Sequence, residues 1–152
     1  MNYRLISTEF YGVGLMNEKE VPRFMTAYRL TLLPGDGTGP EVIEQAKKTL
    51  SVFEELGPLS FDITEIPCGG QFYLETGLEW PEGSFEHCRD DSDSIVVGAV
   101  GWPGARLPNG DVAGGQVLLG LRSALDLYAN VRPVRLYRGV NHKVHGSFKD
   151  VW

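Results

Sequence analysis

The fold is decided by residues 28–56, YRLTLLPGDGTGPEVIEQAKKTLSVFEEL. This stretch begins with a short apolar run, Tyr28–Leu33, which predicts a buried strand. Residues 41–56 repeat apolar side chains every three or four positions, which predicts a helix. Pro40 suits the first helical position, because the N–H group that proline lacks would have no partner there. The stripe expected to face the core consists of Val42, Ile43, Ala46, Leu50, Phe53 and Leu56.

The next part of the chain continues this alternation of strands and helices. Residues 61–66 alternate in polarity as a strand does, and residues 81–89 predict a short helix that starts at a proline. Residues 95–100, IVVGAV, are typical of a parallel strand that is covered on both faces. The order strand, helix, strand, helix, strand predicts an α/β fold with parallel strands and right-handed crossovers.

Two further segments follow the last of these strands. Residues 116–127 predict a second long helix. Residues 130–137 predict an extended segment, which Pro133 would confine to a sheet edge or a bulge. The leucines expected to face the core on the helix are Leu118, Leu121 and Leu125, with Leu119 as a further candidate.

The amino-acid composition excludes several classes of protein. The chain has 152 residues, 42% of them hydrophobic, which allows one domain with a real core. Its 14 Lys and Arg against 20 Asp and Glu give a net charge of −6, which excludes a globally basic nucleic-acid binder. No apolar run reaches the about 18 residues that predict a membrane span. We therefore expect neither a nucleic acid nor a membrane as partner.

The first 24 residues differ from the rest. They contain Glu9, Glu18 and Glu20 and no continuous apolar core, so they do not match a secretory signal. We interpret residues 1–24 as an N-terminal extension and residues 25–152 as the folded portion. Without a secretory signal the expected compartment is the cytoplasm, where Cys68 and Cys88 would stay reduced.

The glycine-rich loop at residues 34–41, PGDGTGPE, could bind an anion. Its glycines would let a ligand approach the backbone, and the following helix offers free N–H groups. The loop matches neither the dinucleotide fingerprint, because its spacing is GxGxG, nor a Walker A loop, because it lacks Gly-Lys-Ser/Thr. A tight turn between strand and helix remains the alternative interpretation.

Two arginines form the other candidate site. Arg122 lies on the leucine-rich helix and Arg132 at the start of the extended segment, so the two could converge on one dicarboxylate. The alternative is a pair of surface arginines whose stems cover apolar neighbours. A metal site is not predicted: His142 and His145 are spaced for a helix, but flanking glycines argue against one. No residue of the chain is predicted to be catalytic.

Three segments together resemble the isocitrate/isopropylmalate/tartrate dehydrogenases. They are LLPGDGTGPEV at 32–42, VVGAVGWPG at 96–104 and LLGLRSALDLYANVRPVRLY at 118–137. The last of the three is highly specific, and the resemblance covers about residues 25–152. Such enzymes oxidise a malate-type 2-hydroxy acid by hydride transfer to NAD or NADP and then release carbon dioxide with the help of Mg²⁺ or Mn²⁺.

The resemblance implies roles for particular residues. Arg122 and Arg132 would bind the substrate carboxylates, and Leu118 and Leu119 fall where isopropylmalate dehydrogenases place apolar pocket residues. Isocitrate enzymes carry Ser and Asn near this point, which the chain does not match. Gly115 stands where many isopropylmalate enzymes have a Glu. The implied neighbours of the cofactor are Gly35, Asp36, Gly37 and Thr38.

The resemblance also implies a fragment. The family fold is a two-domain α/β subunit that works as a homodimer, and residues 25–152 correspond to its N-terminal part: a βαβαβ portion of the first domain and the opening strand of the second. The catalytic tyrosine, the partner's lysine and the metal-binding aspartates have no counterpart here. We therefore expect no turnover from the chain alone. The alternative is a non-catalytic α/β remnant that binds an anion or pairs with full-length subunits.

Overall fold

The computed structural model describes residues 3–4, 16–17 and 26–133. Its main sheet has three parallel strands, β3 (Thr26–Gly35), β4 (Leu59–Glu65) and β5 (Ser94–Ala99), in the order β4-β3-β5. Two short strands, β1 (Tyr3–Arg4) and β2 (Met16–Asn17), form a separate antiparallel pair. The predicted parallel α/β fold is therefore confirmed.

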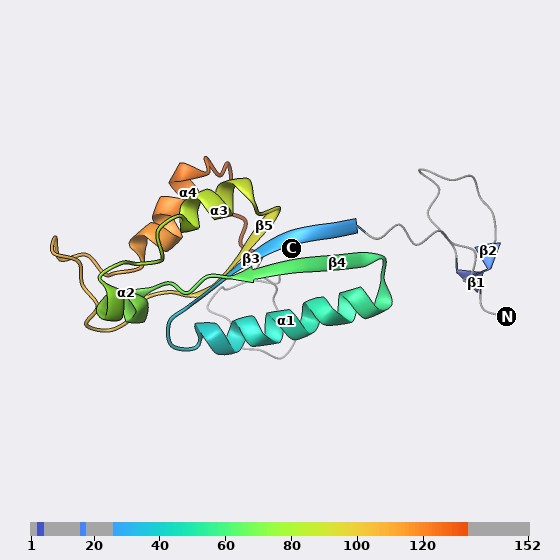
Figure 1. Cartoon of the computed structure of the whole chain (residues 1–152), viewed down its shortest axis with the longest axis horizontal. Coiled ribbons are helices and arrows are strands. Elements are labelled where there is room, and N and C mark those ends of the chain that lie inside the picture. Colours follow the sequence, from blue (N-terminus) through green and yellow to red (C-terminus); the bar gives the residue numbers. More distant parts are fainter. Residues whose placement is uncertain (1–2, 5–15, 18–25, 134–152) are drawn as a thin grey trace, which may run out of the picture.

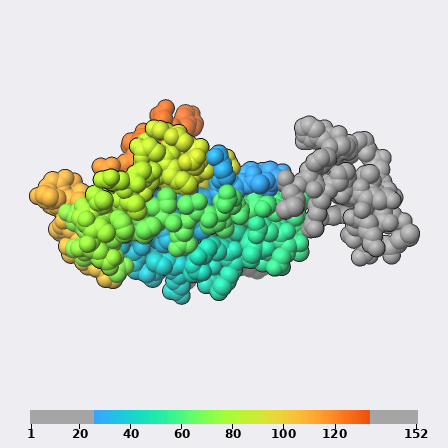
Figure 2. Space-filling model, viewed as in Figure 1, coloured from blue at the N-terminus to red at the C-terminus, as the bar shows by residue number. Residues whose placement is uncertain are grey.

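Helices lie on both sides of the main sheet. The long helix α1 (Gly39–Leu56) runs along one side, whereas α3 (Ser84–Asp90) and α4 (Leu121–Ala124) lie on the other (Figure 1). The short helix α2 (Gly70–Thr76) follows β4 and lies near the carboxyl ends of the strands (Figure 1). Figure 2 shows the same arrangement in space-filling form, with α1 along the lower edge of the view. The strands and helices thus form three layers.

The core lies between the sheet and the helices that follow β4. Side chains of a strand alternate between its two faces, so Thr31 and Leu33 of β3 point to one side, and Leu30 and Leu32 to the other. All four are buried, as expected for the central strand of the sheet. The buried cluster on the α3 side consists of Leu33, Ile66, Cys68, Cys88, Val117 and Leu121.

Helix α1 ends at Leu56 as predicted, but half of the six apolar side chains on its stripe do not reach the core. Ile43 is 1% exposed, whereas Val42, Phe53 and Leu56 are 56%, 53% and 73% exposed. The prediction that these three face the core is wrong. Neighbouring helical positions are about 100° apart, so a stripe that includes both Val42 and Ile43 is wider than the face that a three-stranded sheet covers. Strand β5 is likewise only half-buried, contrary to the expectation of full cover.

The second long helix is shorter than predicted and begins differently. Residues Gln116–Gly120 form a π-helical turn, labelled η1, and only Leu121–Ala124 are α-helical. Asp126 then takes a left-handed conformation, with φ of 51°, which ends the helical run. Val117 and Leu121 are buried, whereas Leu119 is 65% exposed, so the expectation that Leu119 faces the core is wrong.

The extended segment predicted at residues 130–137 is described only as far as residue 133, and its first four residues form no strand. The predicted opening strand of a second domain therefore lies largely outside the described residues. None of the helices that the structure describes is long and apolar enough to cross a membrane.

Candidate functional site

Asp36 anchors the glycine-rich loop to the rest of the molecule. Its side chain is buried, at 1% exposure, and its carboxylate accepts three backbone hydrogen bonds. Gly70 donates to Oδ2 (2.8 Å), Gln71 to Oδ1 (2.8 Å) and Gly101 to Oδ2 (2.7 Å). One side chain therefore joins the loop after β3, the start of α2 and the loop after β5. Because both oxygens have partners within the protein, Asp36 acts as a structural anchor.

The glycines of the loop serve two different purposes. A Cβ atom on Gly35 or Gly39 would overlap backbone carbonyl oxygens, those of Ala99 and Pro34 respectively, so both glycines allow close packing against β5. Gly37 is different, because it is exposed and a Cβ would meet only the Trp102 ring, at 3.9 Å. The loop is thus largely the tight turn that the sequence left as an alternative.

The loop leaves two residues free to contact a ligand. Gly37 and Thr38 are exposed at its tip, whereas Gly35 and Asp36 face into the protein. A cavity of about 440 Å³ lies beside the loop and is lined by Gly35, Glu65 and Glu75 among others. Its two carboxylates and the lack of a lysine or arginine among its lining residues do not suit a pyrophosphate. The described residues therefore fit a cofactor only at the exposed tip, Gly37 and Thr38.

Arg122 lines a larger, mostly apolar cavity of about 520 Å³ between α3, β5 and the helical run 116–124. Leu118 lines the same cavity, as does Arg89, whose guanidinium is paired with Asp90. The apolar part of the lining is formed by Cys88, Ile95, Val97, Val117, Leu118, Leu121, Leu125 and Leu127. A guanidinium at the edge of an apolar cavity suits a carboxylate that carries an alkyl group.

The other two predicted substrate residues do not line this cavity. Arg132 is exposed, and its Nε donates to the Asn130 side-chain oxygen at 3.4 Å. Leu119 is exposed on the helical run. Within residues 26–133 the structure therefore places Arg122 and Leu118 together at one cavity and leaves Arg132 and Leu119 outside its lining.

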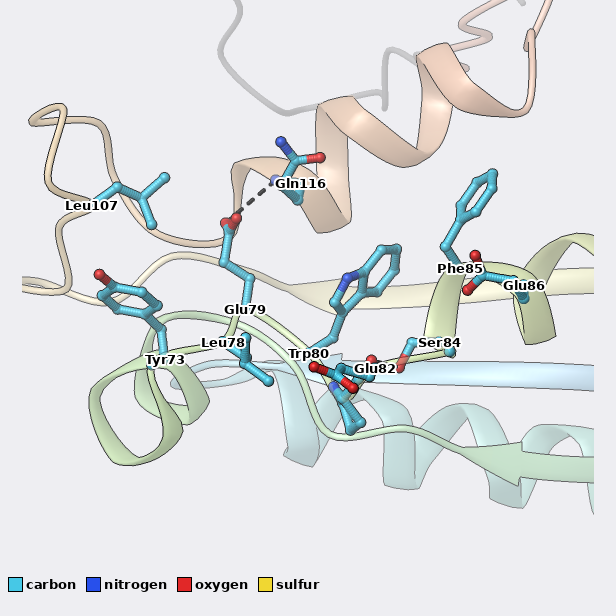
Figure 3. A pocket seen from close by; sticks show the side chains of 13 residues that line it. Tyr73, Leu78, Glu79, Trp80, Glu82, Ser84, Phe85, Glu86, Leu107 and Gln116 are labelled. Carbon is cyan, nitrogen blue, oxygen red and sulfur yellow. Dashed lines mark hydrogen bonds between the residues drawn. The ribbon is translucent and has the colours of Figure 1, made fainter.

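Sequence reasoning missed Glu79, a buried carboxylate in the loop between α2 and α3. Its side chain accepts hydrogen bonds from the backbone N–H groups of Gly114 and of Gln116, the latter at 3.3 Å. It lines a pocket of about 330 Å³ together with Trp80, Leu107 and Gln116 (Figure 3). No motif singles out this residue, because its partners lie 35 and 37 positions away in sequence.

The two cysteines are free, buried thiols in the core cluster. Burial raises the pKa of Cys68 to about 11, while a hydrogen bond with the Gly35 backbone acts in the opposite direction. Burial also raises the pKa of Cys88. Both thiols are therefore protonated at neutral pH, which suits packing rather than nucleophilic chemistry.

The described residues include no group of three His, Cys, Asp or Glu side chains that could hold a metal ion. His142 and His145, the pair considered from the sequence, lie outside the described residues.

Comparison with known proteins bears on the whole of this region. The sequence model of the isocitrate/isopropylmalate dehydrogenase family matches residues 29–150. A 3-isopropylmalate dehydrogenase of Aquifex aeolicus is 40% identical over 114 residues, which cover 74% of this chain and 31% of the relative. The corresponding enzyme of Thermobifida fusca is 41% identical over 118 residues, 78% of this chain and 32% of the relative.

The chain therefore spans about a third of the length of the curated relatives it matches. A solved structure, the apo form of a beta-decarboxylating dehydrogenase from Thermococcus kodakarensis, is 35% identical with a TM-score of 0.49. The aligned region covers 66% of this chain and 27% of that one.

Proposed function

Since the chain belongs to the isocitrate/isopropylmalate dehydrogenase family, we propose that residues 25–152 are the N-terminal, substrate-binding portion of an oxidoreductase that oxidises and decarboxylates a malate-type 2-hydroxy acid. The whole reaction requires segments that the relatives carry in the remaining two thirds of their length. We propose 3-isopropylmalate as the substrate, with tartrate and malate as the competing choices.

The observation that carries this proposal is the shared position of Arg122 and Leu118 at one cavity. Arg122 would bind a substrate carboxylate through its planar fork, and Leu118 would contact the substrate's alkyl group. The lining of this cavity is mostly apolar, which favours an alkyl-bearing malate over tartrate. An apolar pocket discriminates by only about 1–3 kcal/mol per methylene, so the preference would be graded.

The family resemblance supplies the roles of the remaining site residues. Arg132 would bind the second carboxylate, and Leu119 would extend the apolar contact. NAD, or NADP in its place, would accept the substrate hydride when bound. Gly37 and Thr38 would contact it, while Gly35 and Asp36 would hold their loop in position. In the complete enzyme, Mg²⁺ or Mn²⁺ would be held by residues other than those described here.

Two further properties belong to the proposal. We place the protein in the cytoplasm, since its cysteines are free thiols. We expect the complete enzyme to be a homodimer, as the resemblance implies. Within this chain, we assign residues 1–24 to an extension that precedes the family portion, which agrees with a family match that starts at residue 29.

The experiment has two parts. Thermal unfolding is followed with and without 3-isopropylmalate, malate, tartrate and isocitrate, and NAD reduction is assayed with the same acids plus Mn²⁺. We expect 3-isopropylmalate to raise the unfolding temperature of the wild type and not that of Arg122→Ala, and we expect no NAD reduction. No stabilisation by any of the acids would overturn the substrate-binding role, and turnover well above a mock preparation would overturn the expected lack of activity.

A second candidate is a non-catalytic module that pairs with full-length subunits. The exposed apolar side chains of α1, Phe53 and Leu56, favour it, because such a surface is typical of an interface. Co-expression with a full-length 3-isopropylmalate dehydrogenase separates the candidates. Stable pairing without any stabilisation by dicarboxylates would favour the module.

A further inference from the structure

Glu79 is a buried carboxylate that holds the start of the helical run 116–124. It is 9% exposed although it lies in a loop, between α2 and α3. One carboxylate oxygen, Oε1, accepts the N–H groups of both Gly114 and Gln116. Figure 3 shows its side chain directed at Gln116, with the hydrogen bond drawn between them.

The helical run needs such a partner. The first N–H groups of a helix have no acceptor within the helix and are usually satisfied by a capping side chain. The residue at this position is Gly115, which has no side chain to offer. Glu79, although distant in sequence, therefore accepts the hydrogen bond that a local capping residue would accept. Its negative charge also suits the positive end of the helical dipole.

Packing and capping fix this run in different directions. Val117 and Leu121 are buried in the core and hold the run against the sheet. Apolar contacts are not directional and allow a helix to slide or turn slightly, whereas hydrogen bonds to its first residue, Gln116, and to Gly114 just before it fix its position along its own axis. Arg122 lies six residues after Gln116 on the same run, so a shift of the run along its axis would also displace Arg122.

Glu79 is itself held by the anchored loop system. Its backbone carbonyl accepts the N–H of Gly69 (2.8 Å), and the next residue, Gly70, donates to the buried carboxylate of Asp36. Two buried carboxylates thus connect the glycine-rich loop to the run that carries Arg122. The two segments proposed to contact cofactor and substrate are linked through Asp36, residues 69–70 and Glu79.

We propose that Glu79 is a positioning residue, which sets the place of Arg122 at its cavity and so the affinity for a dicarboxylate. This inference rests on the proposed function, since it concerns the same substrate site. Glu79 does not line the Arg122 cavity, and its effect must therefore pass through the helical run.

The experiment makes two measurements on the full chain. Calorimetry gives the dissociation constant for 3-isopropylmalate, and hydrogen exchange gives the protection of the backbone amides. We expect Glu79→Ala to weaken binding by about tenfold or more, because the run that carries Arg122 would lose the acceptor for one buried and one part-buried N–H group at its start. Glu79→Gln keeps an acceptor oxygen and should restore binding to within about threefold of the wild type. Glu82→Ala, which removes an exposed carboxylate nearby, is the matched control and should leave binding unchanged.

A merely structural role predicts a different pattern. In that case Glu79→Ala would lower the unfolding temperature and raise amide exchange throughout the chain, with an unchanged dissociation constant, and the proposal would be overturned. If Glu79→Ala does not fold, Glu79→Asp replaces it, because the shorter side chain cannot reach both N–H groups. A wild-type dissociation constant in Glu79→Asp would then overturn the proposal.

Failure of the proposed function has its own signature. If the wild type does not bind 3-isopropylmalate, the substrate assignment is wrong. The amide exchange rates then provide the test of whether Glu79 positions the helical run. Exchange that becomes at least about tenfold faster only at residues 114–124 in Glu79→Ala would uphold its positioning of the run. Exchange that is unchanged there, or faster everywhere alike, would overturn it.

Discussion

Asp36 anchors the fold from within the glycine-rich loop. The family resemblance implies that Asp36 is a neighbour of the cofactor. Its carboxylate faces inward and accepts N–H groups from the start of α2 and from the loop after β5. The sequence could not reveal this role, because the three donors follow Asp36 by 34, 35 and 65 positions.

Replacement of Asp36 by alanine is expected to be strongly destabilising. Three buried or part-buried N–H groups would lose their acceptor, and each such loss costs about 1–3 kcal/mol. We expect the free energy of unfolding in urea to fall by about 3 kcal/mol or more. Asp62→Ala removes an exposed carboxylate and serves as the control, with an expected change within about 0.5 kcal/mol. A change of the same size in both variants would contradict the anchoring role.

Cys68 predicts a dependence of stability on alkaline pH. Burial raises its folded-state pKa from 9.0 to about 11, so above pH 9 the unfolded chain loses its proton first. The stability due to this group is complete below pH 9 and is lost as the pH rises toward 11. Urea unfolding between pH 7.5 and 10.5 should show a decline that is shallower in Cys68→Ala. Equal slopes in the two proteins would refute the assignment.

At the scale of elements, the turn from β3 into α1 packs tightly against the end of β5. Gly39 and Gly35 allow this contact, because a side chain at either position would overlap backbone atoms of the neighbouring segments. The sequence predicted the strand, the turn and the helix correctly, since all three depend on local pattern. It could not show that the glycines serve the packing of β5.

Gly39→Ala is therefore expected to destabilise the protein. The added methyl group would overlap the Pro34 carbonyl oxygen, and overpacking of this kind costs about 1–3 kcal/mol. Gly115→Ala is the matched control, because its φ of −62° is helical and a Cβ there meets nothing within 4 Å. We expect the control to be neutral or slightly stabilising in chemical unfolding. Equal losses in the two variants would show that the close contact is absent.

The run 116–124 shows where local pattern fails. Its leucines predicted one helix of 12 residues, but it begins as a π-helical turn and ends at Ala124. Apolar periodicity cannot distinguish these geometries, because the spacing of a single π-helical turn differs from that of an α-helix by less than one residue. The contact that holds its first residues comes from Glu79, which is distant in sequence.

At the scale of the whole molecule, β4 and β5 are the edge strands of the main sheet. Within the described residues, each of them pairs with β3 alone. Large apolar side chains are exposed on α1 beside it. The sequence predicted the parallel α/β class, which the structure confirms. It overestimated how much of α1 is covered, because periodicity shows which side chains share a face and not what packs on that face.

This surface is expected to make the chain self-associate. Free strand edges and contiguous exposed apolar side chains promote association. The average mass in sedimentation should rise with protein concentration, and Phe53→Lys combined with Leu56→Lys should suppress the rise. Val112→Lys, at a similarly exposed but separate site, should not. A monomer at every concentration would contradict the expectation.

The structure brings only some of the proposed substrate residues together. Arg122 and Leu118 were named from the sequence and share one cavity, whereas Arg132 and Leu119 do not line it. Ten residues separate the two arginines, and the backbone turns within them at Asp126, so their spacing alone could not determine whether they meet. The family motif identifies these residues, but only the packing of α3 and β5 against the run forms the cavity.

Calorimetric titration of the chain with 3-isopropylmalate tests the central claim most directly. The wild type is compared with Arg122→Ala and with Arg106→Ala, which removes an exposed arginine away from the cavity. A charge-assisted hydrogen bond contributes about 1.5–3 kcal/mol, so Arg122→Ala should weaken binding by at least about tenfold and Arg106→Ala should bind as the wild type does. Equal affinity in all three proteins, or no binding by any of them, would contradict the account.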